Sequence, residues 1–210
     1  MADAVMQINK IAAETIHVPI VGTAPLIVHN WSEKAKREIL NRQQGRKSLK
    51  EVRDPQAEYL SSLYRIADEG GGDRYGFPVL AFKAATIGGG RFYGKSVTMT
   101  SLRQAMFFRG IVTKADPQML VEIHGDPRMR EDAVRLGGPG NSADMRYRAE
   151  FVEWSAVLTI TYVTSMLSRD SVLSLVDAGG MGVGVGEWRP ERKGQFGTYA
   201  IDLNRDIKVD

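Results

Sequence analysis

The chain has 210 residues, 43% of them hydrophobic, and a formal net charge of +3 with a pI near 9.1. This length fits one domain with a single sizeable core better than two domains. The chain has no cysteine, which excludes a disulfide framework and a thiolate zinc site, and its three histidines (His17, His29, His124) are far apart in sequence. We therefore expect no metal and no cofactor, while the mild positive charge permits nucleic acid as a partner without requiring it. With no apolar run of membrane-spanning length and no signal-peptide pattern, the sequence predicts a cytoplasmic protein with no membrane partner.

The first regular element predicted is a strand over residues 14–22. Its residues alternate, with Ile16, Val18 and Ile20 on one face, which is typical of a half-buried strand. Because Pro19 has no N–H, we expect the strand to lie at an edge or to bulge there.

A turn and a short extended segment follow at residues 24–29, and a helix is predicted over about 33–43 with Ser32 as its N-cap. Residues 42–53 are the most basic window and show no strong periodicity, so we interpret them as a basic loop. Two interpretations are open for this loop, a solvated linker and an arm that follows a phosphate chain. Its cations of interest are Arg42, Arg46, Lys47 and Lys50.

Asp54 and Pro55 form a strong helix start, with a capping side chain and a proline at the first helical position. Residues 75–80 are extended, and a helical pattern follows over 81–93. Three glycines at 88–90 cost about 1 kcal/mol each against alanine inside a helix, so we expect another surface to approach closely there.

Residues 94–150 are the least regular part of the chain. They predict a short helix over 100–108, a strand over 119–124, and a protruding hairpin or long loop over 125–148. The arginines of that last segment, like Arg103, are either solvated or in contact with a neighbouring subunit.

The C-terminal part is regular again. Residues 155–163 alternate as a strand, a helix capped by Ser168 is expected to stop at Gly179, and residues 198–203 form a final strand. Strand, helix, glycine-rich loop and strand make one half of a split βαβ unit. We therefore predict an α+β fold with a ferredoxin-like or RRM-like core.

The glycine-rich stretch at 179–197 carries Arg189, Arg192 and Lys193 between two aromatic residues, Trp188 and Phe196. One interpretation is a turn that joins a helix to an edge strand. The other is a phosphate cradle, because glycine allows close approach and basic groups bind phosphates. A dinucleotide site is excluded because the glycines precede a strand instead of opening a helix.

Three segments resemble motifs of the RAMP proteins of CRISPR systems. They are the Pro-Leu turn at 24–29, the Pro-hydrophobic-Lys helix start at 77–85 with Arg91, and the Gly-hydrophobic-Gly, basic, Gly-hydrophobic-Gly pattern at 184–197. The resemblance, closest to the backbone subunits, implies one domain over 1–210, a ferredoxin-like core at 14–93 and 151–205, and a large thumb-like insertion at 94–150. It also implies side-by-side assembly of copies along a strand. A phage-encoded relative binding single-stranded DNA is an alternative to a CRISPR subunit binding RNA.

On this basis we predict a protein without catalytic activity that binds single-stranded RNA or DNA independently of sequence and forms homo-oligomers or filaments along it. The binding candidates are Arg42, Arg46, Lys47, Lys50, Lys83, Arg91, Arg189, Arg192 and Lys193, and the base-stacking candidates are Trp31, Tyr93, Trp188 and Phe196.

Two alternatives to simple binding stay open. The first is a metal-independent endoribonuclease of the repeat-processing type, for which His29 is a weak candidate as general base or acid. A second cleavage candidate, Asp54, is already explained by helix capping. The other alternative is a non-enzymatic phage protein that copies the surface of a CRISPR subunit.

Overall fold

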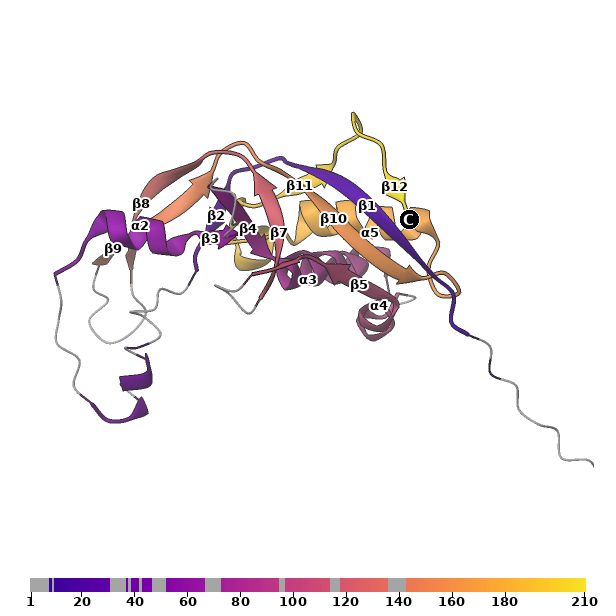
Figure 1. Ribbon diagram of the computed structural model, residues 1–210, viewed down its shortest axis with the longest axis horizontal. Helices are drawn as coiled ribbons and strands as arrows, with labels where there is room; N and C mark the ends of the chain where they lie inside the picture. The colour runs from indigo at the N-terminus through magenta and orange to yellow at the C-terminus, as the bar shows by residue number, and fades with distance from the viewer. Residues whose placement is uncertain are drawn as a thin grey trace, which may run out of the picture.

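The computed structural model describes residues 8, 10–30, 37, 39–41, 43–46, 52–66, 73–94, 97–113, 118–135 and 143–210. It shows an α+β fold built from antiparallel strands and two main helices (Figure 1). In chain order the elements are β1 (Ala13–Gly22), β2 (Leu26–Val28), α2 (Pro55–Ser62), β3 (Tyr64–Ile66), β4 (Arg74–Pro78), α3 (Val79–Gly89), the 3-10 turn η1 (Gly90–Tyr93), α4 (Met99–Ala105), β5 (Met106–Arg109), β6 (Ile111–Val112), β7 (Met119–His124), β8 (Pro127–Arg135), β9 (Ala143–Phe151), β10 (Ser155–Val163), α5 (Arg169–Gly182), the 3-10 turn η2 (Pro190–Arg192), β11 (Tyr199–Ile201) and β12 (Lys208–Val209).

The main sheet has the strand order of a ferredoxin-like core. Its path runs β11-β1-β10-β7-β4-β3, and its first four strands, taken with α3 and α5, follow the chain order β1, α3, β7, β10, α5, β11. This is the βαββαβ arrangement with the first and third strands in the centre. The predicted α+β fold class is therefore confirmed.

Strand β1 pairs with β10 along its whole length and shows the predicted alternation. Ile16, Val18 and Ile20 are fully buried on the helix side. The carbonyl of Pro19 accepts from Asp202 N–H on the other edge of the strand. On that edge β12 pairs only with Ile16 and His17, and β11 only from Ile20 onward. Pro19 thus lies at the break between the two partner strands β12 and β11. Its missing N–H therefore costs the sheet no hydrogen bond there.

Helices α3 and α5 pack together on one face of the sheet at a contact made by glycines (Figure 1). A Cβ on Gly179 would lie 2.4 Å from the carbonyl oxygen of Ala85, and a Cβ on Gly89 2.6 Å from the backbone nitrogen of Gly179. The close approach expected at 88–90 is therefore made by the protein's own helix. Gly179 therefore serves the packing of the two helices. The predicted stop of the helix at Gly179 is wrong, because α5 continues to Gly182.

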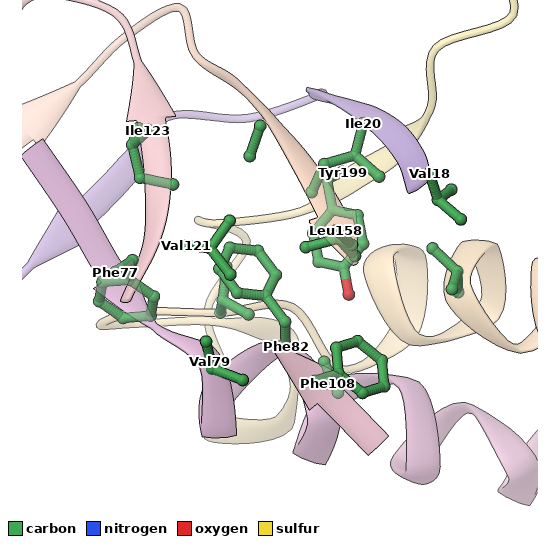
Figure 2. Packing of buried hydrophobic residues seen from close by; sticks show 14 of the residues in the cluster. Val18, Ile20, Phe77, Val79, Phe82, Phe108, Val121, Ile123, Leu158 and Tyr199 are labelled. Atoms are coloured by element: carbon green, nitrogen blue, oxygen red, sulfur yellow. The ribbon is translucent and has the colours of Figure 1, made fainter. Parts of the chain in front are cut away.

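The core lies between these helices and the sheet. Figure 2 shows the ring of Phe82, from α3, among side chains of β4, β7, β10 and β11. Its ring centroid is 5.8 Å from that of Tyr199 and 6.1 Å from that of Phe77. Burial of these large apolar side chains stabilises the attachment of both helices to the sheet.

A second sheet of order β2-β9-β8 extends from the end of the first. Strands β8 and β9 continue β7 and β10 beyond a bend at Gly125, which has φ 149° and whose Cβ would lie 2.4 Å from the carbonyl oxygen of Glu153. Helix α2 packs on this hairpin: Tyr59 donates to the carbonyl of Pro127, and the backbone N–H of Ala149 donates to Ser62 Oγ at 2.8 Å. The β8–β9 hairpin arches away from the core over α2 (Figure 1).

The segment 94–150, expected to be one insertion, is divided between these two sheets. Its first part supplies α4 and β5–β7 to the main sheet and its helix layer, and β7 is itself one of the four ferredoxin-like strands. Of the described part of this segment, only the β8–β9 hairpin protrudes. Its assignment as a thumb stays a prediction.

The expected helix over 33–43 and the basic loop over 42–53 lie largely outside the described residues. Of the first, residues 37, 39–41 and 43 are helical. Of the second, Arg46 is described and exposed. Asp54 caps α2 as predicted, because its carboxylate accepts from the backbone N–H groups of Gln56 and Ala57 at 3.0 and 3.1 Å.

Candidate nucleic-acid interface

A pocket of about 220 Å³ lies between α3 and the glycine-rich loop that follows α5. The helix contributes Ala81, Ala84 and Ala85, whose small side chains share one face and leave room for the loop. The full lining is His29, Tyr64, Phe77, Ala81, Ala84, Ala85, Val183, Gly184, Val185, Gly186, Glu187, Arg189 and Glu191.

The glycine-rich loop is closed on itself by its own backbone. Gly184, Gly186 and Gly197 have φ values of 68°, 79° and 63°, a region that favours glycine. The N–H of Val185 donates to the carbonyl of Gly197 at 2.9 Å, and the N–H of Glu187 to the carbonyl of Ile27 at 3.0 Å. The first bond closes the loop and the second holds it against β2, so neither N–H is available to a phosphate.

His29, the weak catalytic candidate, is one of the residues that line the pocket. Its Nδ1 atom is 3.6 Å from Glu187 Oε1, while the other carboxylate oxygen is 3.4 Å from the guanidinium of Arg148. The His29 ring, and then the charge of Arg148, lower the pKa of Glu187 against the opposing effect of burial. Glu187 was not predicted as a functional residue. Its position beside a cluster of basic residues in the sequence gave no sign of these partners.

Glu187 belongs to a charged network that joins the loop to the β8–β9 hairpin. Arg148 is 2% exposed and donates to Asp132 at 2.7 Å. Arg130 bridges Asp132, at 3.0 Å, and the buried Glu150, at 2.7 Å. These arginines of the hairpin, left open between solvent and a subunit contact, are thus paired within the chain.

Trp188 and Phe196, two of the base-stacking candidates, contact each other in a tilted arrangement with ring centroids 6.0 Å apart. The guanidinium carbon of Arg130 lies 4.8 Å from the Phe196 centroid, and that of Arg148 lies 4.9 Å from the Trp188 centroid. Both rings are half-buried. They connect the loop to the hairpin through cation–π contacts, and a base stacked there would have to share their faces with arginines.

Two of the predicted binding cations, Arg189 of the loop and Arg91 of η1, converge on one carboxylate. Arg189 donates to Glu191 at 2.9 Å and to the carbonyl of Gly186 at 3.1 Å, and Arg91 approaches Glu191 at 3.9 Å. Arg192 and Lys193 are exposed at the tip of the loop, where Lys193 adopts φ 65°. No described carboxylate is within 4.0 Å of either of these two cations.

Lys83 lies apart from the loop cations, in a second basic surface. Its ammonium is 5.3 Å from the ring centroid of Phe107 and 3.4 Å from the carbonyl oxygen of Arg103. Phe107 is 50% exposed, and Arg103 and Arg109 are exposed beside it on α4 and β5. We call Lys83, Arg103, Phe107 and Arg109 the cation–aromatic surface. Phe107 and Arg109 were not predicted, although their alternation with buried Met106 and Phe108 is a strand signal.

Among the remaining candidates, Tyr93 lies beside α5. The hydroxyl of Tyr93 donates to the carbonyl of Ser174 at 3.0 Å, which leaves the ring 46% exposed beside α5. Four candidates, Arg42, Lys47, Lys50 and Trp31, lie outside the described residues.

The central strands β1 and β10 do not offer the stacking platform of an RRM. Their outward side chains include Thr15, which hydrogen-bonds Thr161 at 2.9 Å, and His17, which hydrogen-bonds Thr159 at 3.1 Å. RRM sheets stack bases on aromatic residues of the central strands. Both strands are described in full, and Tyr162, their one residue among Phe, Tyr and Trp, is only 3% exposed.

Among the residues that the structure describes, no three histidine, aspartate or glutamate side chains are grouped so that they could hold a metal ion. The helices of these ranges are also too short or too polar to cross a bilayer.

The fold and the loop define a ferredoxin-like α+β protein with a glycine-rich loop after its second core helix. Among solved structures, the crystal structure of Cmr6 from Pyrococcus furiosus is similar, with a TM-score of 0.43 and 11% sequence identity over 92% of this chain and 100% of that chain. At that similarity the match does not assign a function. No protein-family model and no curated protein matches the sequence.

Proposed function

We propose that the protein binds single-stranded nucleic acid through its phosphate backbone, independently of sequence, and that it does so without catalysis. The proposal combines the motif resemblance to RAMP proteins with the ferredoxin-like strand order. Side-by-side assembly of copies along the strand is part of the same proposal.

The observation that carries the proposal is the uneven pairing of the basic residues. Three arginines of the β8–β9 hairpin, Arg128, Arg130 and Arg148, bind carboxylates, whereas Lys83, Arg103 and Arg109 have no carboxylate within 4.0 Å among the described residues. The ammonium of Lys83 lies 5.3 Å from the ring centroid of the exposed Phe107, and Arg109 follows Phe107 by two residues on the same face of β5. Cations without a carboxylate partner neutralise phosphates, and an exposed ring supplies a face for a base.

Titration of fluorescent single-stranded DNA, single-stranded RNA and duplex by anisotropy tests the proposal. We expect both single strands to bind, with an affinity that falls as salt rises. Lys83→Ala, Arg103→Ala and Arg192→Ala should each weaken binding to all sequences alike and reduce the salt slope by about one. Arg65→Ala is the matched control, because Arg65 already pairs with Asp73 at 3.0 Å.

Absence of binding to either single strand at low salt would contradict the proposal. So would a loss confined to particular sequences. Assembly is tested separately, by electron microscopy with and without long oligonucleotides, where copies spaced along the strand are expected. A co-purified nucleic-acid absorbance would separate this function from that of a phage protein that only copies a CRISPR subunit's surface.

A second candidate function, metal-independent RNA cleavage, is favoured by one contact. The carboxylate of Glu187, 3.6 Å from His29 Nδ1, would orient the imidazole ring, which is how a carboxylate supports a histidine that acts as a general base. Incubation of structured RNA in EDTA tests it. Fragments that disappear with His29→Ala would establish cleavage, and their absence with the unaltered protein leaves binding as the function.

A further inference from the structure

The lining of the pocket between α3 and the glycine-rich loop includes acidic residues. Glu187 and Glu191 both line it. Because the pKa of Glu187 is lowered by its neighbours, this carboxylate is ionised at neutral pH. Carboxylates repel phosphate groups. The phosphate chain of a bound strand is therefore not what this pocket accepts, although basic residues stand near it.

The lining of the pocket combines apolar and polar groups, and the pocket is small. Alanines of α3 and the rings of Tyr64 and Phe77, edge to face at 5.6 Å, contribute the apolar part. Its volume of about 220 Å³ is smaller than the roughly 300–1,000 Å³ of sites that enclose a whole drug-sized ligand. A pocket of this size, with apolar contacts and polar partners together, suits one base.

We propose that the pocket takes one unpaired base of the bound strand, and that Glu187 accepts hydrogen bonds from the N–H groups of that base. This inference rests on the proposed binding of single strands, and it adds the preference of one pocket for one base to phosphate contacts that do not read sequence. Glu187 keeps acceptor capacity, because each carboxylate oxygen has two lone pairs and His29 and Arg148 approach one oxygen each.

The carboxylate of Glu187 should bind some bases more tightly than others. Guanine presents two adjacent N–H donors on its Watson–Crick edge, which match the two oxygens of a carboxylate. Thymine and uracil present one N–H between two carbonyl oxygens, which a carboxylate repels. Arg189 does not reverse this preference, because its guanidinium is bound to Glu191 and to the carbonyl of Gly186. Guanine is therefore the favoured occupant.

Anisotropy titrations with three single-stranded DNAs test the inference: all-thymidine, alternating thymidine–guanosine, and alternating thymidine–inosine, which lacks the 2-amino group. We expect the guanosine strand to bind on the order of tenfold more tightly than the all-thymidine strand, with the inosine strand between them. Ala84→Leu fills the pocket from an exposed helix position and should bring the ratio to about one, with all-thymidine binding kept.

Glu187→Gln, which changes the acceptor without filling the pocket, should also remove the preference. Ala133→Leu, an exposed position on β8, is the control and should leave it intact. Equal affinities of the unaltered protein for the three strands, or a preference that survives in Ala84→Leu, would overturn the inference while single-strand binding stands. Failure to bind any strand, all-thymidine included, would overturn the proposed function as well.

Discussion

At the scale of single residues, the buried guanidinium of Arg148 is the strongest link between the hairpin and the glycine-rich loop. It contacts Asp132, Glu187 and the ring of Trp188. Arg148→Met should destabilise the fold by on the order of 3 kcal/mol, because it leaves buried Asp132 with only Arg130 as a partner. The free energy of urea unfolding measures this cost.

Arg128→Met is the matched control for that substitution. Arg128 also pairs with a buried carboxylate, that of Glu150, but its own side chain is 65% exposed and Arg130 remains as a second partner. We expect a loss below about 1 kcal/mol. Equal losses for the two variants would show that burial of Arg148 has no special role.

At the scale of elements, the packing of α5 on α3 depends on the absence of a side chain at Gly179. Replacing glycine by alanine inside a helix normally stabilises it by about 1 kcal/mol. At Gly179 the sign should reverse, because the new Cβ would lie 2.4 Å from the Ala85 carbonyl oxygen and would force the two backbones apart. We expect Gly179→Ala to lower the thermal midpoint, at a cost of about 1–3 kcal/mol.

Gly182→Ala separates this effect from a general intolerance of α5. There the new Cβ would meet the tip of the Phe92 ring, whose side chain is 58% exposed and free to swing outward. The midpoint should therefore change little or rise. A larger loss at Gly182 than at Gly179 would contradict the backbone-contact explanation.

At the scale of the whole molecule, three ion-paired carboxylates should make the free energy of unfolding depend on pH in the acidic range. Arg169 lowers the pKa of Glu14, Arg74 lowers that of Glu122, and His29 lowers that of Glu187. A carboxyl whose pKa is depressed in the fold contributes stability above its unfolded pKa of about 4.3, and that contribution is lost as the pH falls through the lower folded value. Stability should therefore fall as the pH drops below about 4.3.

Urea midpoints from about pH 7 to about pH 3 measure this dependence. The combined variant Glu14→Gln, Glu122→Gln and Glu187→Gln should be less stable at neutral pH and should show a flatter profile in acid. Glu131→Gln, an exposed carboxylate on β8, is the control and should keep the slope of the unaltered protein. A steep profile that persists in the combined variant would assign the acid sensitivity to other groups.

Local signals in the sequence were enough to predict several elements, although the helix expected over 100–108 ends at Ala105 and continues as β5. The alternation of Ile16, Val18 and Ile20 predicted β1, the capping carboxylate of Asp54 predicted the start of α2, and the pattern at 119–124 predicted β7. Such signals depend on periodicities of two and 3.6 residues and on hydrogen bonds to neighbours along the chain. A single chain therefore displays them without reference to its fold.

The tertiary structure alone decided what those elements contact. It made β7 a strand of the ferredoxin-like core, turned the glycines at 88–90 and 179 into a helix contact, and brought Glu187 to His29 and Arg148 across long stretches of sequence. The candidate site shows the same limit. The sequence identified Arg189, Arg192 and Lys83 as basic, but which cations are already paired depends on carboxylates supplied by other elements. Pairing of that kind depends on distances in space, and these distances cannot be read from residue types and their spacing along the chain.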